Sequence, residues 1–500
     1  MTEYNFEPRH NEVSRHVISG FLNSGVVQAI KFLCQFASVV VTSRLLPPTD
    51  FGIIAMAVPA YWFVTLFLDF GLGQATVQKP ALTHEEANAF FWINTAAGFV
   101  LMLLLAALSP LAGWYFNEPR VVVLTAAMGP IILLSAIGSQ PGSIMRRRME
   151  FGWLALNDVI GTLSGLIAAV AIAVIYKSYW ALYAGMAVST VVSVAGIWLV
   201  SGWRPSYPRL VHGVKDLLTF GAAITLSNFM GYISGVADNL LIGRRWGDEG
   251  LGLYDRAYKL LLFPLQRVVG PIAGTMVPVL SRLTHEPDRY RSIFLRTLAQ
   301  MALIAWPGIL WALVMGDPLL PILLGPQWKE AIPIFRPLAV VSLLAVVGIP
   351  GGWILMTHRH TVKFTRWSII GAITNVAAFV IGLPYGTMGV ATAFAIAETL
   401  RTPFFWWDVT RDGPVRLKEV VNAILPQTIG CAAAYASLLA ERQVLGDNIG
   451  LIAMGFGGGL AYVVTVIVML LFPGGRDTLG QTLHTAHRIL RHVQALFEKE

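Results

Sequence analysis

The composition of the chain excludes a soluble protein. Of its 500 residues, 55% are hydrophobic and only 13% are charged, the formal net charge is +8, and there are two cysteines. Ordinary soluble domains have roughly 25% charged residues, so this chain could not cover a soluble globule with polar side chains. Disordered chains and secreted disulfide scaffolds are excluded as well, because the apolar content is high and the cysteines are few.

The apolar residues are grouped into fourteen stretches, each long enough to cross a bilayer as a helix, which takes about 20 residues. Because these stretches are continuous rather than short and alternating, a transmembrane β-barrel is excluded. The predicted fold is all-α and polytopic, with about 14 transmembrane helices. They lie near residues 20–43, 51–69, 88–114, 121–143, 153–175, 179–200, 217–243, 254–281, 297–316, 332–357, 367–384, 388–406, 418–440 and 448–472.

The distribution of lysine and arginine determines the predicted orientation. Residues 1–19 are polar and contain three glutamates, so they do not have the basic start of a cleaved signal peptide, and we expect a cytoplasmic N-terminal tail. If every stretch spans, basic residues on the inner side outnumber those in the outer loops more than threefold. Both termini are therefore predicted to be cytoplasmic. The basic runs at 146–148 and 359–366 are interpreted as part of this orientation signal rather than as a lipid or partner site.

The segment after the last predicted span, 476–500, has the pattern of an amphipathic helix. Its apolar residues recur at alternating intervals of four and three, with Arg488, Arg491 and His492 between them. A basic amphipathic helix of this kind lies on the inner leaflet and binds membrane lipids. We expect simple anchoring, with docking of a cytoplasmic partner as the alternative. The apolar positions are Leu479, Leu483, Ala486, Leu490, Val493 and Phe497.

The chain contains an internal repeat of about two hundred residues. Residues 43–57 align with 243–257 at an offset of 200, and Leu-Thr-His-Glu at 82–85 returns at 283–286. Pro-Gly precedes a basic loop at 141–142 and again at 350–351, and 187–190 has a loose counterpart in 395–399. Both halves start on the inner side, so the repeats are parallel and pseudo-symmetric about an axis along the membrane normal. The predicted parts are an N-lobe of six helices at 20–200, a cytoplasmic inter-lobe linker at 201–216, a C-lobe of six helices at 217–406, and an extra helix pair at 418–472.

The repeat favours a transporter that acts as a monomer, because channels usually achieve symmetry by oligomerising. No phosphate-binding G-x-x-x-x-G-K-[ST] loop, no D-x-D pair and no long outer loop occurs, so we expect no enzyme activity. The histidines at 358 and 360 and at 484, 487 and 492 have no cysteine or carboxylate cluster beside them, so no metal is expected. Cys34 and Cys431 are interpreted as small core residues. No cofactor and no nucleic-acid partner are expected.

Polar side chains follow one face of the first helix of each predicted lobe. Such residues inside a membrane normally face a cavity or the bundle interior. In the seventh span, Asn228, Tyr232 and Asn239 share a face, with Asp238 adjacent to it. In the first span, the face consists of Ser24, Gln28, Lys31, Gln35, Ser38 and Thr42.

The predicted spans also hold an excess of cations. Arg256, Lys259 and Arg267 lie on one face of the eighth span, and Arg336 enters the tenth. With Lys31 they predict a cationic, hydrogen-bonding cavity for an anionic, polar molecule that cannot cross lipid unaided. The alternative is that these charges form interhelical ion pairs, which applies above all to Arg336 and to the Glu398/Arg401 pair. The carboxylates available for pairing are Asp158, Asp238, Asp255 and Glu398.

Several segments resemble a known family. Residues 43–56 (SRLLPPTDFGIIAM) and 69–78 (DFGLGQATVQ) resemble motifs of the Wzx-like polysaccharide flippases, in the multidrug/oligosaccharidyl-lipid/polysaccharide exporter superfamily. Residues 323–328 (LLGPQW), and 382–386 (GLPYG) with 389–391 (GVA), are similar to second-half motifs of that family. The likeness covers about 20–410. It implies two lobes, alternating access, and an undecaprenyl-diphosphate-linked oligosaccharide moved from the cytoplasmic to the periplasmic leaflet of the bacterial inner membrane.

We therefore expect a flippase for lipopolysaccharide or exopolysaccharide repeat units. The cations named above would bind the diphosphate, the polar stripes would bind sugar hydroxyls, and Asp238 or Glu398 would serve a coupling ion, if one is used. The alternatives are a peptidoglycan-precursor (lipid II) flippase, a drug or cation antiporter of the same superfamily, and a non-transporting scaffold for a polysaccharide assembly complex. Polymerase and chain-length proteins of such a system are the expected protein partners.

Overall fold

The computed structural model describes residues 13–68, 72–79, 81–207, 214–445 and 450–484. Side chains are described from residue 27 onward within these ranges, except at 29, 214–231, 233–234, 263–264, 266–268, 271 and 451. The described residues form sixteen α-helices and two short 3-10 helices, and they contain no strand. The chain divides into two compact units, Met1–Gly252 and Leu253–Glu500.

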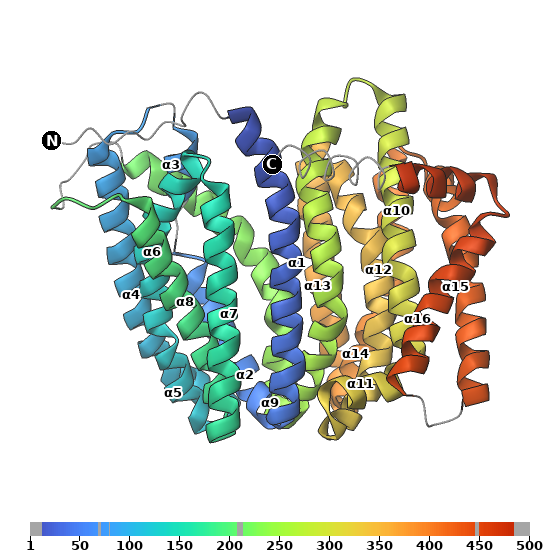
Figure 1. The fold of residues 1–500 in the computed structure, drawn as a ribbon, viewed down its shortest axis with the longest axis horizontal. Coiled ribbons are helices and arrows are strands. Elements are labelled where there is room, and N and C mark those ends of the chain that lie inside the picture. Colours follow the sequence, from blue (N-terminus) through green and yellow to red (C-terminus); the bar gives the residue numbers. More distant parts are fainter. Residues whose placement is uncertain (1–12, 69–71, 80, 208–213, 446–449, 485–500) are drawn as a thin grey trace. The chain divides into compact units, whose positions relative to one another are not determined.

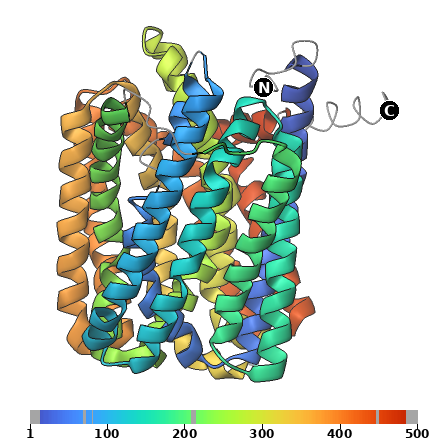
Figure 2. The same ribbon diagram turned by 90° about the vertical axis from the view of Figure 1, so that its left-hand side faces the viewer.

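The first unit is a bundle whose long helices run roughly parallel to one another (Figures 1 and 2). Helix α4 packs on α2, α5 and α6, and α7 packs on α1 and α8. The α7–α8 contact is close because Gly165 and Gly185 face each other's helix, where an added Cβ at Gly165 would lie 2.6 Å from the Gly185 carbonyl oxygen. The helices are α1 (Val13–Leu45), α2 (Pro48–Thr65), α3 (Leu72–Gln78), α4 (His84–Phe116), α5 (Pro119–Ala127), α6 (Gly129–Arg147), α7 (Phe151–Tyr176), α8 (Trp180–Ser201) and the first part of α9 (Val214–Arg282).

The second unit holds the rest of α9 and seven further helices among its described residues. Helix α10 packs on α12, α15 and α16, and α14 packs on α12 and α13 (Figure 1). The helices are α10 (Pro287–Val314), α11 (Gly316–Leu324), α12 (Ile332–Thr357), α13 (Thr361–Gly382), α14 (Gly386–Arg411), α15 (Leu417–Leu445) and α16 (Leu451–Met469), with 3-10 helices η1 (Pro326–Ala331) and η2 (Leu383–Tyr385).

Within the described part of the chain, nine segments are long and apolar enough to cross a membrane. Three of them combine more than one helix: Pro119–Arg147 contains α5 and α6, Pro326–Thr357 contains η1 and α12, and Thr361–Arg411 contains α13, η2 and α14. The apolar stretches expected at 217–243 and 254–281 both lie in α9, which has a non-helical residue at Gly247 (φ 71°). The prediction of an all-helical protein with many membrane spans is confirmed.

The starts of the two sequence repeats touch each other within the first unit. A Cβ added to Gly52 would lie 1.7 Å from the carbonyl oxygen of Asp248, and a Cβ added to Gly252 would lie 1.9 Å from the carbonyl oxygen of Pro48. The two contacts are equivalent under the repeat: Gly52 corresponds to Gly252, and Asp248 corresponds to Pro48, at the offset of 200 residues. We call residues 48–52 and 248–252 the glycine crossing. Only glycine lets the two backbones approach this closely.

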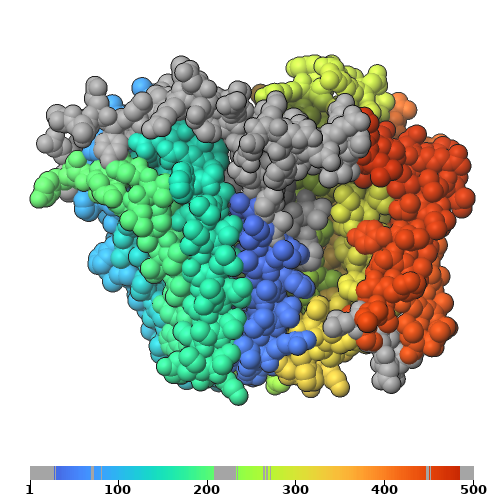
Figure 3. Space-filling model, in the orientation of Figure 1, coloured from blue at the N-terminus to red at the C-terminus, as the bar shows by residue number. Residues whose placement is uncertain are grey.

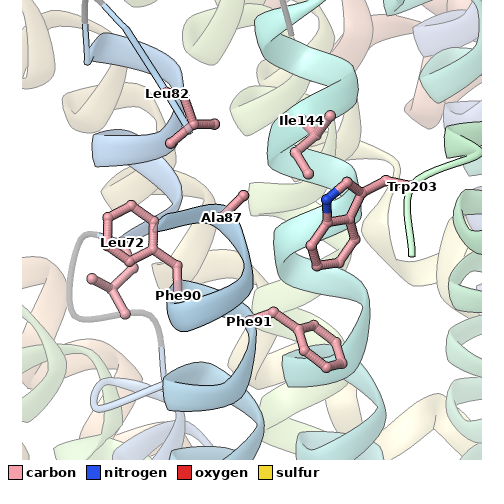
Figure 4. Close-up of a cluster of buried hydrophobic side chains, with 7 residues drawn as sticks. All are labelled: Leu72, Leu82, Ala87, Phe90, Phe91, Ile144 and Trp203. Atoms are coloured by element: carbon pink, nitrogen blue, oxygen red, sulfur yellow. The ribbon is translucent and has the colours of Figure 1, made fainter. Parts of the chain in front are cut away.

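An apolar cluster fixes the end of α8 to α4. Gly202 ends α8 with φ 61°, a left-handed conformation that turns the chain and directs it toward α4. The next residue, Trp203, is fully buried and packs against Phe91. The other members of the cluster come from α3, α4, the segment before α4, and α6 (Figure 4). They are Leu72, Leu82, Ala87, Phe90 and Ile144.

The described start of the predicted inter-lobe linker is tied to α4 by hydrogen bonds. Asn88 donates from Nδ2 to the Tyr207 carbonyl (2.9 Å) and accepts at Oδ1 from the Ser206 N–H (2.8 Å). Trp92 Nε1 donates to the Ser206 carbonyl at 2.8 Å. Of the basic run 146–148, Arg147 donates to the Thr76 and Lys79 carbonyls and Arg148 to the Ser201 carbonyl. These two arginines therefore connect the end of α6 to the residues around α3 and to the end of α8, in addition to any effect on the orientation of the chain in the membrane.

Part of the predicted C-terminal amphipathic helix is described. Residues 473–484 are helical, whereas 485–500, which include Arg488, Arg491 and His492, lie outside the described residues. Gln300 Nε2 on α10 donates to Thr482 Oγ1 at 3.4 Å, so the described part of this helix contacts the second unit.

Candidate functional site

The polar face of α1 is anchored to α7 by an ion pair. Lys31 Nζ lies 2.8 Å from Asp158 Oδ2, and the two side chains are 17% and 55% exposed. Gln28, one turn before Lys31, is exposed, and Gln35, one turn after it, is half-buried. Figure 3 shows the described part of α1 (blue) beside α7 (teal) on the face toward the viewer. The lysine is thus partly buried and its carboxylate partner remains accessible.

The residues predicted on the first part of α9 belong to the same unit. Tyr232 donates from its hydroxyl to the Pro59 carbonyl of α2 at 2.8 Å, and its ring lies 5.9 Å from that of Phe63. Asp238 is buried and accepts at Oδ1 from the Asn239 N–H at 2.8 Å. Asn239 is half-buried, and the side chain of Asn228 is not among those described.

The cations predicted on the second part of α9 belong to the second unit. Lys259 Nζ lies 2.8 Å from Asp255 Oδ1 one turn earlier, and the lysine is 50% exposed while the aspartate is buried. Arg256 is buried, at 8% exposure, directly after Asp255. The side chain of Arg267 is not among those described. Asp255 therefore offsets part of the positive charge that Arg256, Lys259 and Arg267 were predicted to place on this part of α9.

Arg336 is part of a three-residue charge cluster. Its Nη2 lies 2.8 Å from both carboxylate oxygens of Asp317, at the start of α11. Arg442 of α15 pairs with the same carboxylate and also donates to the Val314 carbonyl at 2.9 Å. The cluster thus connects α11, α12 and α15. The sequence identified Arg336 but gave no reason to connect it with Asp317 or Arg442, which are 19 and 106 residues away in the chain.

The expected Glu398–Arg401 ion pair is present on α14. Arg401 also donates from Nη1 to Thr374 Oγ1 and Asn375 Oδ1 of α13, each at 3.1 Å. Both side chains of the pair are mostly buried, at 15% and 21% exposure. A pair that is surrounded by hydrogen-bond partners in this way joins the two helices.

The predicted site residues therefore fall into separate groups. Lys31, Tyr232, Asp238 and Asn239 lie in the first unit, while Arg256, Lys259, Arg336 and Glu398 lie in the second. Three of the predicted cations, Lys31, Lys259 and Arg336, each contact a carboxylate. In each such pair, an incoming anion could take the place of the carboxylate and bind the cation. Among the described residues no group of His, Cys, Asp and Glu could hold a metal ion.

Comparison with known proteins identifies the family. The model of a family described as "Polysaccharide biosynthesis protein" matches residues 41–333, more than half of the chain. Among curated proteins, the lipopolysaccharide biosynthesis protein WzxC of Escherichia coli K12 is 24% identical over 77% of this chain and 79% of its own length. The teichuronic acid biosynthesis protein TuaB of Bacillus subtilis is 25% identical over 81% of this chain and 86% of its own length.

Solved structures agree on the fold. The lipid II flippase MurJ in an inward closed conformation superposes with a TM-score of 0.73 and 13% identity, over 91% of this chain and 99% of that one. An inward-facing MATE transporter of the MOP superfamily gives a TM-score of 0.62 with 15% identity, over 78% and 97%. The chain therefore belongs to the Wzx-like polysaccharide biosynthesis family of multi-pass membrane transporters, which are not enzymes.

Proposed function

We propose that the chain is a flippase for undecaprenyl-diphosphate-linked oligosaccharide repeat units, which it moves from the cytoplasmic to the periplasmic leaflet for lipopolysaccharide or exopolysaccharide biosynthesis. The observation that carries the proposal is the match of residues 41–333 to the polysaccharide biosynthesis family. The relatives named for lipopolysaccharide and teichuronic acid biosynthesis support a polysaccharide precursor as cargo. The fold shared with a lipid II flippase supports a lipid-linked cargo.

The proposed architecture has fourteen spans, two six-helix lobes with an extra helix pair, and both termini in the cytoplasm. The lobes rock about a central cavity in the bacterial inner membrane, so that the cavity opens to one side at a time. The oligosaccharide travels through the cavity while its lipid tail stays in the bilayer. The protein acts as a monomer and receives its cargo from, and delivers it to, other proteins of the assembly system, including a polymerase and chain-length proteins.

The diphosphate is held by Lys31, Arg256, Lys259, Arg267 and Arg336. The ion pairs of Lys31, Lys259 and Arg336 favour an exchange, in which the diphosphate takes the place of a carboxylate beside each cation. Attraction between charges is stronger where water is scarce, so cations within the membrane attract the diphosphate more than cations at the rim. The sugar hydroxyls contact the polar residues Gln28, Gln35, Asn228, Tyr232 and Asn239.

The alternative functions differ from the proposed one to different degrees in the contacts that they would need. A lipid II flippase has the same fold and would also use cations. A drug or cation antiporter would need a cavity lined by carboxylates, which the pairing of acids with cations in this chain disfavours. A scaffold without transport would not need charges within its spans. If transport is coupled to an ion, Asp238 and Glu398 are the proposed carboxylates, and export that persists after both uncoupler treatment and Na⁺ removal would exclude coupling.

The test is a clean deletion in a strain with no paralogue, complemented with the wild-type gene. We expect lipid-linked repeat units to accumulate on the inner leaflet and the surface polymer to disappear, both restored by complementation. Normal polymer export in the deletion would refute the proposal. Loss of viability with accumulation of lipid II would instead identify the peptidoglycan-precursor flippase.

A further inference from the structure

A carboxyl group in α15 stands apart from every charged group described above. Glu441 lies one turn before the end of α15 and lines an open groove-like cavity of about 760 Å³ between α15 and α16. Both of its carboxyl oxygens are buried, and neither has a hydrogen-bond partner in the part of the chain that the structure describes. The rest of the cavity wall is almost entirely apolar. It includes Ala440, Val444, Ile452, Phe456 and Leu460.

No positive charge in the described residues around Glu441 neutralises it. Its neighbour Arg442 directs its guanidinium to Asp317 and to the Val314 carbonyl. Helix α16 has no charged residue, and its Tyr462 donates from its hydroxyl to the Ile304 carbonyl. The charged residues of α10 are at its far end: Asp288, Arg289, Arg291 and Arg296. On α14, Glu398 pairs with Arg401, Asp408 pairs with Arg366, and Arg411 lies over the Trp407 ring.

A glycine allows the carboxyl to approach α16 closely. A Cβ added to Gly457 would lie 2.7 Å from Glu441 Oε2, whereas a Cβ added to Gly459, one half-turn away on the same helix, would meet no atom within 4 Å. The carboxyl is therefore packed against the α16 backbone. Burying an ionised carboxylate that has no hydrogen-bond partner is costly, so packing of this carboxyl against α16 favours its neutral form.

We propose that Glu441 is a proton-binding site that couples proton movement to transport, in addition to the carboxylates Asp238 and Glu398 named above. The carboxyl holds a proton while α15 and α16 are packed together, and it releases the proton when their separation admits water. Movement of this pair reaches α10 directly, since Trp311 Nε1 donates to the Met454 carbonyl and Tyr462 to the Ile304 carbonyl. In the proposed orientation, the end of α15 that holds Glu441 faces the periplasm.

The proton site itself is tested without any transport. Dicyclohexylcarbodiimide reacts with protonated carboxyl groups in apolar surroundings, and the adduct is located by peptide mass spectrometry on the purified full-length protein. We expect Glu441 to be labelled at neutral pH, labelling to fall as the pH rises, and the ion-paired Glu398 to remain unlabelled. Absence of adduct at Glu441, or labelling that does not depend on pH, would overturn the site.

Two glycine variants test the packing of the carboxyl without replacing Glu441. Gly457→Ala places a methyl group 2.7 Å from Glu441 Oε2 and should displace the carboxyl, so its labelling should change several-fold. Gly459→Ala is the matched control, because its methyl group meets open space. Equal labelling in wild type and both variants would contradict the packing on which the proposal depends.

The coupling step depends on the proposed flippase function, and its test separates the two. We expect Glu441→Gln, which resembles the protonated form, to fold normally and to export polymer at least tenfold less than wild type. Export by the Gln variant that remains normal and uncoupler-sensitive would refute coupling through Glu441. If the wild-type protein supports no export at all, the flippase proposal fails, while the labelling experiment still decides whether Glu441 binds a proton.

Discussion

Replacement of Gly52 by alanine would test the glycine crossing. The new Cβ would lie 1.7 Å from the Asp248 carbonyl oxygen and 2.7 Å from the Asp248 Cα, whereas real Cβ atoms essentially never come closer than 3.0 Å to another heavy atom. Both clashing groups are backbone, so no side chain can rotate away. The two segments would have to separate by more than 1 Å, and overpacking of this kind costs about 1–3 kcal/mol or more.

The gain in helix propensity does not offset this cost. Alanine is favoured over glycine inside a helix by about 1 kcal/mol, and Gly52 lies in α2. Gly152→Ala in α7 provides the control, because a Cβ there meets no atom within 4 Å. We expect Gly52→Ala to lower the Tm of the detergent-solubilised protein and Gly152→Ala to leave it unchanged or raised. Gly252→Ala should match Gly52→Ala, since its Cβ would lie 1.9 Å from the Pro48 carbonyl oxygen. Equal Tm values for Gly52→Ala and Gly152→Ala would refute the crossing.

Three further changes have distinct expected outcomes. Lys31→Ala should abolish export while the Tm stays near that of wild type. Lys31→Arg should retain more export than Lys31→Gln. A loss of Tm that parallels the loss of export would mean that the Lys31–Asp158 pair is structural. Arg147→Ala should lower the free energy of unfolding by about 1.5–3 kcal/mol in thermal unfolding, because two backbone carbonyls lose a charged donor. Arg146→Ala, at an exposed position, should change this free energy little. The hydrogen bonds from Arg120 lower the pKa of Glu118 in the folded protein. The ionised carboxylate therefore stabilises the fold above its unfolded pKa, and this contribution is lost as the pH falls through the lowered folded-state pKa. A Tm difference between wild type and Glu118→Gln that does not shrink toward acid pH would contradict this.

The membrane helices could be predicted closely from the sequence, because continuous apolar runs leave no other structure in lipid. The stretch at 153–175 became α7 (Phe151–Tyr176), and that at 332–357 became α12 with the same ends. The prediction stopped α15 at residue 440, since Glu441 and Arg442 are charged. The helix continues to Leu445, because Arg442 pairs with Asp317 and the Glu441 carboxyl is buried against α16.

The partners of the candidate site residues were predictable only when they were local. The Glu398–Arg401 pair and the Asp255–Lys259 pair lie three and four residues apart, so helical geometry alone brings them together. The Lys31–Asp158 pair joins residues 127 positions apart, and nothing in the sequence distinguishes Asp158 from the other acids within spans. Packing decides such partners, and it is also what leaves Glu441 without one among the described residues.

The glycine crossing has a consequence for how such a chain could arise. Pro48 meets Gly252, and Gly52 meets Asp248, so each segment contacts the other with the same patch of surface. A self-complementary contact of this kind is what a two-fold axis produces between identical subunits. Two copies of a single half-length ancestor could have paired through this patch before their genes fused. The contact would then be older than the covalent link between the halves, and the linker would need only to connect subunits that already recognised each other.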